Sequence, residues 1–448
     1  MKKFIETIKN IWSIEDLRNR ILTTLLLVLI YRAGSYIALP GIDPTALANF
    51  QKTSNQGILG LFNMFAGGSF SRASIFALGI MPYISASIAI QLLTIAVPKF
   101  QKLQKEGESG RQKINQYTRL LTVVVTALQA SAYVAYLRNQ SAGAIIQEYG
   151  SFMFWLSTTI VLTAGTLFVM WLGEKITDKG IGNGTSIIIM MGILARLPES
   201  LLQEFASRTT DGGGGLLIFL VEIAFFILIT IGLILLIQGT RKIPVNYAKR
   251  IVGNKQYGGV RQFIPLKVNA AGVMPIIFAQ AIMFIPATAI GFATSSEDAS
   301  GFVRIFSDHT NPYYNMIYAV LVIVFTFFYT ALIFNPTTMA DEMKSNNGFI
   351  PGVKPGQATA DYIGAVMDRI TLPGAFFLAL VGVLPGIAAA LHINTNFATF
   401  FGGTSLLIMV GVILDTLQQI ESQLLMRHYD GLMSSGRIKG RTSPASAQ

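Results

Sequence analysis

The chain alternates long apolar runs with shorter polar or charged stretches over most of its length. A helix needs about 20 mostly apolar residues to cross the roughly 30 Å hydrocarbon core of a bilayer. Helices are expected because hydrocarbon cannot satisfy open backbone groups, and the alternating pattern of a membrane β-barrel is absent. The pattern predicts ten transmembrane helices, at 21–38, 74–97, 120–137, 153–172, 185–203, 216–238, 270–291, 316–334, 372–391 and 404–421.

Composition supports this interpretation. Charged residues make up 13% of the chain and hydrophobic residues 52%, with a mean hydropathy of +0.53, whereas a soluble domain carries about 25% charged residues. These values argue against a soluble enzyme, a disordered tail or a nucleic-acid-binding domain. The chain has no cysteine, which excludes disulfides, thiolate metal sites and cysteine nucleophiles.

The positive charge of the chain predicts its orientation. Lys and Arg number 34 against 23 Asp and Glu, a net charge of +11. With the N-terminus inside the cell, 27 of the 34 cations fall on the cytoplasmic side, so the positive-inside rule places both termini in the cytoplasm. Three cytoplasmic loops are long, at 98–119, 239–269 and 335–371. They serve either as orientation signals that also bind anionic lipids or as a docking face for a large acidic partner.

Two pairs of segments repeat within the chain. Residues 77–86 and 270–279 are identical at six of ten positions, and residues 184–192 and 403–411 at six of nine. The repeats pair the second span with the seventh and the fifth with the tenth. Five spans per half make the second half inverted, which places a functional pathway between the halves. The predicted organisation is a cytoplasmic segment 1–20, halves 21–205 and 206–424, and a cytoplasmic tail 425–448.

The repeat nominates residues along that pathway. Ile80 and Ile84 lie one helical turn apart, and Val273 and Ile277 occupy the matching positions. Ile189 matches Ile408 in the second repeat. A single isoleucine in a membrane helix usually faces lipid or the core, but a matched set on one axis would form a hydrophobic constriction that excludes water and ions by dewetting.

Chemistry other than a passive path finds little support. The ionisable groups Arg32, Glu222 and Asp415 fall within spans, where we expect them to pair internally or to snorkel. No phosphate-binding G-x-x-x-x-G-K-[ST] motif, catalytic dyad or metal cluster is evident, so the chain is predicted not to be an enzyme and to use no cofactor. A solute transporter with inverted repeats is the alternative, and it predicts a charged midplane site. A scaffold or insertase without a pore is a third hypothesis, against which the repeated apolar positions argue.

One apolar segment is too short to span a bilayer. Residues 56–70 read QGILGLFNMFAGGSF and come directly before the second span. The segment is either an interfacial helix or a stopper folded back into the cavity.

Several motifs resemble one family. Residues 74–91, SIFALGIMPYISASIAIQ, resemble the signature of the SecY family, the central channel subunits of the bacterial protein translocase. Further resemblances follow in the family's order, at RAGSYIALPGID (32–43), KEGESGR (105–111), GIGNGTS (180–186), NYAKR (246–250), PLKVN (265–269), PGVKPG (351–356) and FGGTSLLI (401–408).

The resemblance implies an all-α membrane protein with ten transmembrane helices in two inverted five-helix halves around a central hourglass pore. An apolar ring at the waist would consist of Ile80, Ile84, Thr185, Ile189, Val273, Ile277 and Ile408. The segment 56–70 would be the plug, with Leu61, Phe62, Asn63, Met64 and Phe65 at its centre. Polar positions of a lateral gate would be Gln91, Gln129 and Asn269, which otherwise are simple interhelical hydrogen-bonding groups.

The resemblance also implies an activity and partners. The channel would translocate unfolded preproteins across the plasma membrane and insert membrane proteins sideways into it, powered by SecA or the ribosome. Cytoplasmic docking would involve Lys249, Arg250, Lys255 and Lys354. Lys354 stands where relatives usually have Arg; it keeps the positive charge but lacks the planar fork of a bidentate contact. Implied partners are SecE and SecG, SecA, the ribosome, signal-bearing preproteins, the accessory proteins YidC, SecD and SecF, and anionic lipids.

Overall fold

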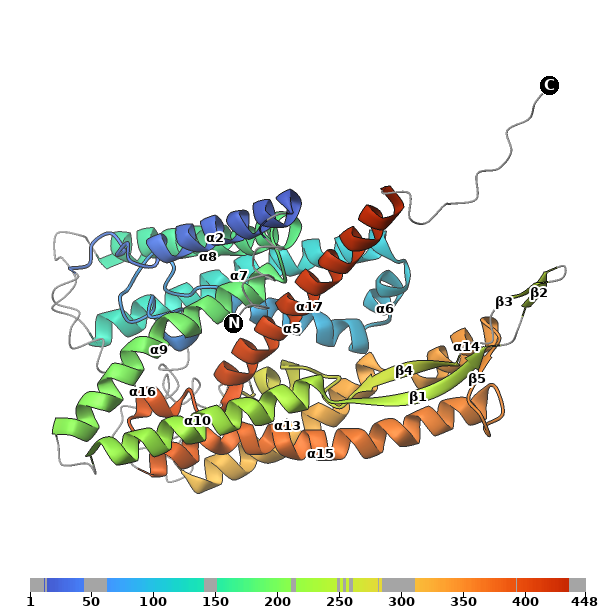
Figure 1. Cartoon of the computed structure of the whole chain (residues 1–448). Helices are drawn as coiled ribbons and strands as arrows, with labels where there is room; N and C mark the ends of the chain where they lie inside the picture. The colour runs from blue at the N-terminus through green and yellow to red at the C-terminus, as the bar shows by residue number, and fades with distance from the viewer. Residues whose placement is uncertain are drawn as a thin grey trace. The chain divides into compact units, whose positions relative to one another are not determined.

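Helices dominate the computed structural model of the chain (Figure 1). It describes residues 12, 14–43, 63–140, 151–210, 215–247, 250–252, 255–257, 261–280, 282–283, 311–391 and 393–434. Seven of the described helices are long and apolar enough to cross a membrane, or eight if a bent pair counts as one span. The described residues form two compact units, one within Met1–Ser54, Phe62–Ala195 and Val412–Gln448, the other within Arg196–Gly411.

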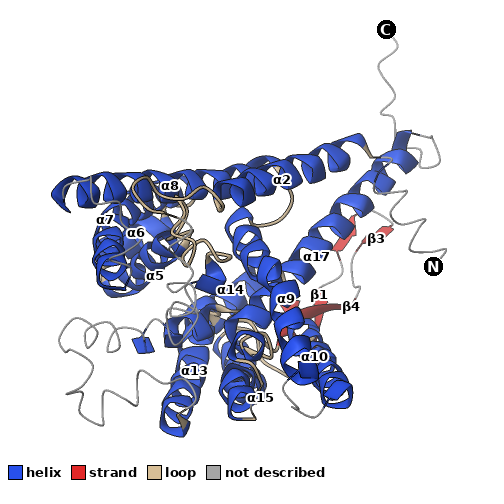
Figure 2. Cartoon of the chain, turned by 90° about the vertical axis from the view of Figure 1, so that its left-hand side faces the viewer, coloured by secondary structure: helices blue, strands red, loops and turns tan. Residues whose placement is uncertain are grey.

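The first unit is a helical bundle. Its helices are α2 (Glu15–Gly34), α5 (Met81–Ala96), α6 (Pro98–Lys105), α7 (Glu108–Gln140), α8 (Ser151–Lys179), and parts of α9 (Gly184–Thr210) and α17 (Gly403–Ser434). α7 packs against α5, α6 and α8, and α2 packs along α8 (Figure 2). The turn from α8 to α9 is tight because Gly184 lies directly against the carbonyl oxygen of Gly173, where a side chain would collide.

The second unit combines membrane helices with a small sheet. Its helices are α10 (Gly215–Gln238), a helical stretch at 274–280, α13 (Pro312–Ile333), α14 (Pro336–Ser345), α15 (Gln357–Ala390) and α16 (Thr395–Ala398). α13 packs along α15, and α16 packs against α15 as well. α10 buries only 11% of its most apolar window, which is typical of a helix that faces lipid.

Three strands and two helices form a module with its own apolar core. β1 (Thr240–Tyr247) pairs antiparallel with β4 (Arg261–Lys267) and with β5 (Gly348–Phe349) in the order β4-β1-β5. Ile243 lies opposite Ile264 in this register. The sheet, α14 and the first turns of α15 constitute what we call the hairpin module. Its buried core consists of Ile243, Val245, Leu266, Met343, Ile350, Ile363 and Met367.

The three stretches predicted as long loops contain regular structure. Segment 98–119 holds α6 and the start of α7, 239–269 holds the strands, and 335–371 holds α14, β5 and the start of α15. β2 (Arg250–Val252) and β3 (Lys255–Tyr257) form a second small hairpin. These stretches were predicted as loops because a search for apolar spans does not detect amphipathic helices and strands that pack on one face only.

The predicted span at 74–97 starts too early. Its helix begins only at Met81, with Pro82 in the first turn, and residues 66–80 form hydrogen-bonded turns instead. Proline is favoured in the first turn of a helix because its missing N–H would be unpaired there. In the span predicted at 270–291, residues 270–273 form bends and turns and helix is described at 274–280 and 282–283. Residues 281 and 284–291 lie outside the described residues, as do 1–11 and 435–448.

The segments that repeat in sequence also match in backbone conformation. Gly79 has φ 53° and Gly272 has φ 64°, the left-handed region that favours glycine. A helix begins shortly after each of them, at residue 81 and at residue 274. In the other pair, α9 begins at Gly184 and α17 at Gly403. The two segments of each pair are therefore local structural equivalents, while the halves 21–205 and 206–424 stay a prediction.

Candidate functional site

The described part of the predicted stopper is folded into the first unit. Asn63, Met64 and Phe65 are 0%, 3% and 7% exposed, while Leu61 and Phe62 lie outside the described residues. Asn63 closes the turn twice: its Oδ1 accepts from the backbone N of Ser71 at 3.0 Å, and its carbonyl accepts from the backbone N of Gly68 at 2.8 Å. This burial favours a stopper over an interfacial helix.

Side chains of neighbouring helices hold the backbone of this segment. The hydroxyl of Tyr31 on α2 donates to the carbonyl of Ala66 at 3.5 Å, and the hydroxyl of Tyr133 on α7 donates to the carbonyl of Phe70 at 2.7 Å. Both tyrosines are buried. Sequence analysis missed these residues because a hydrogen bond to a distant backbone carbonyl leaves no pattern along the chain.

Four predicted ring residues belong to the first unit. Ile80 is buried at the start of α5, and the backbone N of Ile84, one turn on, donates to its carbonyl at 3.1 Å. Ile189 is buried on α9. The hydroxyl of Thr185 donates to Oδ1 of Asn183 at 2.6 Å, and the same oxygen accepts from the backbone N of Thr185 as a helix N-cap. The polar atom of Thr185 is thus satisfied by its own helix start.

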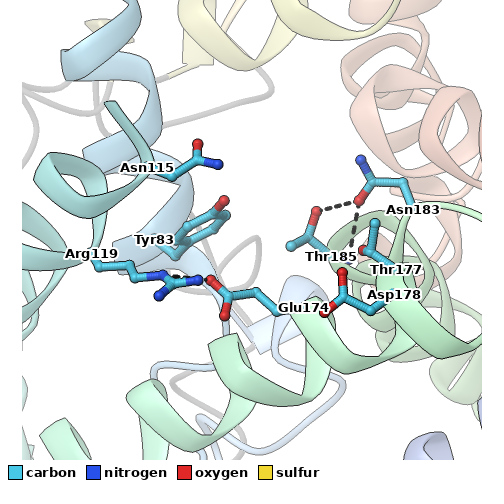
Figure 3. A pocket seen from close by; sticks show the side chains of 8 residues that line it. All are labelled: Tyr83, Asn115, Arg119, Glu174, Thr177, Asp178, Asn183 and Thr185. Carbon is cyan, nitrogen blue, oxygen red and sulfur yellow. Dashed lines mark hydrogen bonds and ion pairs between the residues drawn. The ribbon is translucent and has the colours of Figure 1, made fainter. Parts of the chain in front are cut away.

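A polar cavity of about 280 Å³ lies next to these residues (Figure 3). Nε of Arg119 on α7 and Oε1 of Glu174 on α8 are 2.9 Å apart across its wall. Tyr83, the neighbour of Ile84 on α5, lines it with Thr185. The lining also includes Asn115, Thr177, Asp178 and Asn183. A hydrophilic space therefore adjoins apolar ring candidates within one unit.

The other three ring candidates belong to the second unit. Val273 and Ile277 are half-buried, and the backbone N of Ile277 donates to the carbonyl of Val273 at 3.3 Å, so the two lie one turn apart as Ile80 and Ile84 do. Ile408 is 4% exposed on α17. The convergence of the two sets on one axis stays a prediction.

The predicted gate residues differ in their surroundings. Gln91 on α5 and Gln129 on α7 are half-buried on two helices that pack together. Nε2 of Gln91 donates to the hydroxyl of Ser87 at 3.4 Å. Asn269 is 9% exposed, and its Oδ1 has no hydrogen-bond partner in the described part of the chain. A buried acceptor without a partner is costly, which makes this position a candidate for a contact made in another state.

The predicted docking cations lie in or beside the hairpin module. Lys354 is exposed, and its carbonyl accepts from the hydroxyl of Thr359 at 2.9 Å, which fixes the loop after buried Ile350. Arg250 and Lys255 belong to β2 and β3, and Lys249 lies outside the described residues.

A buried ion cluster accounts for one of the charges predicted within spans. Nη2 of Arg208 is 2.6 Å from Oε1 of Glu222, and its Nε is 2.8 Å from Oε1 of Glu204. The other oxygen of Glu204 accepts from the backbone N of Asn394 at 2.9 Å. The expected internal pairing of Glu222 is confirmed. Asp415 is exposed.

The comparisons with known proteins agree on one family. The family model described as SecY matches residues 74–417. The chain belongs to the SecY family. It is similar to protein translocase subunit SecY of Streptomyces scabiei, with 44% identity over 93% of this chain and 97% of the relative. Its similarity to the SecY subunit of Aquifex aeolicus is 41% identity over 95% of this chain and 98% of the relative.

Solved structures of SecY and Sec61 channels share the fold. A protein-conducting channel matches with a TM-score of 0.63 and 17% identity, over 90% of this chain and 92% of that one. Sec61 in the canine ribosome–channel complex matches with a TM-score of 0.59 and 16% identity, over 90% and 92% of the two chains. The predicted fold class, a ten-helix membrane protein of the SecY type, is confirmed, and the chain is a multi-pass membrane protein. The transporter alternative is not supported.

Proposed function

We propose that this SecY-family chain is the channel subunit through which unfolded preproteins cross the bacterial plasma membrane and membrane proteins enter the bilayer sideways. It would act as a conduit without enzymatic activity, with both termini in the cytoplasm. The observation that carries the proposal is the described part of the segment 56–70, in which residues 63–70 are buried and the backbone carbonyls of Ala66 and Phe70 are held by side chains of α2 and α7. A segment held in this way fits a plug that seals a path and can leave it.

The apolar ring suits such a path. Ile80, Ile84, Thr185, Ile189, Val273, Ile277 and Ile408 would together form the constriction. Apolar side chains exclude water and ions when nothing passes and bind no particular sequence strongly when a polypeptide does. The polar cavity beside Tyr83 and Thr185 fits a hydrated entrance that leads to the constriction.

Gating would depend on differential affinity. A hydrophobic signal segment that enters between the second and third spans and the seventh and eighth would contact Gln91, Gln129 and Asn269. It shifts the channel toward the open state only if it binds that state better. The Oδ1 of buried Asn269, which has no hydrogen-bond partner among the described residues, supports a role there, because an open state could supply the missing donor.

The hairpin module is the proposed docking site for the driving partner. Similar structures include Sec61 in the canine ribosome–channel complex and the yeast Ssh1 complex bound to the yeast 80S ribosome. For this chain we propose the ribosome or a SecA-type ATPase as the partner at Lys249, Arg250, Lys255 and Lys354, with SecE- and SecG-type subunits in the complex. YidC, SecD, SecF and anionic lipids are proposed accessory contacts.

Reconstitution tests the proposal. The chain and its partner subunits are placed in liposomes with a SecA-type ATPase and a precursor that carries a signal sequence. The expected result is ATP-dependent protection of the precursor from external protease. The control is the same protein without its signal sequence, which should stay accessible to the protease. Solute uptake driven by an ion gradient, without precursor protection, would contradict it.

A further inference from the structure

Two arginines converge on one backbone carbonyl of the plug segment. Nη2 of Arg72 donates to the carbonyl oxygen of Gly67 at 2.8 Å, and Nη1 of Arg32 on α2 donates to the same oxygen at 3.2 Å. A carbonyl oxygen has two lone pairs, so it accepts both bonds. The ring of Tyr36 lies beside both cations, with its centroid 4.2 Å from Cζ of Arg72 and 5.6 Å from Cζ of Arg32.

The backbone at this point is shaped for the two guanidinium groups. Gly67 and Gly68 have φ values of 64° and 84°, which side-chain-bearing residues rarely adopt. A methyl group at Gly67 would stand 2.7 Å from Nη1 of Arg32, and one at Gly68 would stand 2.8 Å from Nη2 of Arg72. The two glycines therefore both orient the carbonyl and leave room for the arginines.

Ordinary roles for these arginines fit less well. An arginine near the membrane surface usually pairs with a carboxylate or snorkels to water. In the described part of the chain, neither Arg32 nor Arg72 has a carboxylate within ion-pair distance, and both are half-buried. Nε of Arg72 is buried without a hydrogen-bond partner among the described residues. Their charges are instead stabilised by the Gly67 carbonyl and the face of Tyr36.

The two bonds differ in what they join. Arg72 follows Gly67 by five residues in the same series of turns, so it can move together with the plug. Arg32 belongs to α2, which packs along α8. Of these two bonds, the one from Arg32 connects the plug to a helix outside it. Two like charges held close together repel each other, and the shared carbonyl and the ring of Tyr36 offset this repulsion in the closed arrangement.

We propose that Arg32 is a positioning residue that holds the plug closed through the carbonyl of Gly67, with Arg72 as the second donor that shapes the plug for this bond. The inference rests on the proposed function, in which residues 56–70 are the plug. A charge-assisted hydrogen bond to a carbonyl is strong enough that its loss shifts the population of the open plug by about ten- to one-hundred-fold.

The absence of cysteine makes plug movement directly measurable. Met64 is 3% exposed in the closed arrangement, so Met64→Cys introduces a single buried thiol into a cysteine-free chain. The reconstituted complex, with cysteine-free partner subunits, is treated at rest with a membrane-impermeant maleimide. Adding Arg32→Gln is expected to raise the labelling rate about ten-fold or more and to raise resting ion conductance, while precursor translocation continues. The matched control is Arg111→Gln, an exposed arginine on α7, which should leave both values unchanged.

The outcomes test the role of Arg32 separately from the plug assignment. Labelling of Met64→Cys should also rise in the parent chain when a precursor is arrested in transit. If it does not, the plug assignment in the proposed function is wrong. If labelling does rise, but Arg32→Gln labels at the parent's resting rate, the proposed role of Arg32 is wrong. Should Arg32→Gln fail to assemble, Arg32→Lys, which keeps the charge but replaces the planar guanidinium with an ammonium, is expected to label at an intermediate rate. Labelling at the parent's rate would overturn the proposal.

Discussion

Gly192 of α9 lies directly against the backbone of Phe65 in the plug segment. A methyl group added at Gly192 would stand 2.7 Å from the carbonyl oxygen of Phe65 and 3.2 Å from the backbone N of Gly67. Backbone atoms cannot rotate away as a side chain does, so any side chain here has to displace the segment. The closed position of the proposed plug would thus depend on Gly192 having no side chain.

Gly192→Ala is expected to open the resting channel. Overpacking a tight contact costs about 1–3 kcal/mol, which would be borne by the closed plug. We expect higher resting ion conductance in planar bilayers, with translocation retained. The control is Gly411→Ala, the equivalent position in the sequence repeat, where a methyl group would meet Cγ2 of Val273 at an ordinary 3.9 Å. Equal conductance in the two variants would argue against this contact.

Polar substitutions in the ring should also make the resting channel leak ions. Ile84→Asn and Ile277→Asn place amides at matched positions of the constriction, where they hold water and weaken dewetting. The measurement is resting ion flux from liposomes, and Ile84→Leu, which keeps the apolar volume, should stay sealed. Unchanged flux in both Asn variants would mean that the ring lies elsewhere.

Charge reversal at the predicted docking cations should impair partner-driven transport of precursors. Lys249→Glu, Arg250→Glu and Lys354→Glu are expected to reduce partner-driven precursor transport more than insertion of the chain itself into the membrane. Lys344→Glu is the control, since it reverses an exposed cation at the end of α14 in the same module. Lys354→Arg should keep transport or raise it, because the guanidinium adds a planar fork to the same charge. Normal transport in all three reversed variants would place docking elsewhere.

The buried ion cluster of the second unit should matter for stability. Arg208→Gln leaves the carboxylates of Glu204 and Glu222 buried without their cation, and breaking a buried pair typically costs about 3–5 kcal/mol. The side chains of these residues are 12%, 1% and 8% exposed. Thermal unfolding in detergent should therefore shift clearly downward. Arg119→Gln removes a more exposed pair with Glu174 and should cost less than about 1 kcal/mol. Similar shifts in both variants would contradict this account.

Apolar runs predicted where helices would lie, but not where they would end. Each of the ten predicted spans carries helix in the part of the chain that the structure describes. α15 begins at Gln357, well before the span predicted at 372–391. The prediction missed its first turns because they are amphipathic and pack on the sheet, so their hydropathy is below that expected of a span. The strands could have been predicted from the sequence. Ile243 and Val245 in β1, and Ile264 and Leu266 in β4, each follow the period of two that is typical of a strand.

The candidate site was predictable only where residues repeat or match a motif. Ile84 and Ile277 were predicted as ring residues because they occupy matching positions of a local sequence that occurs twice in the chain. Arg32 attracted notice as a charge within a span, but its acceptor did not, because a carbonyl oxygen is the same for every residue. Long-range contacts such as that of Gly192 with Phe65 depend on the folded path of the chain and have no counterpart in local sequence.

The length of α15 has a mechanical consequence. Its 34 residues extend about 51 Å in one helix. The first turns are fixed in the core of the hairpin module, and later turns pack along α13 and against α16. A force on the module near Lys354 would therefore be transmitted along a single helix through the depth of the bilayer. Pro373 and Pro385 each remove one backbone hydrogen bond from this helix, so it can bend at two positions.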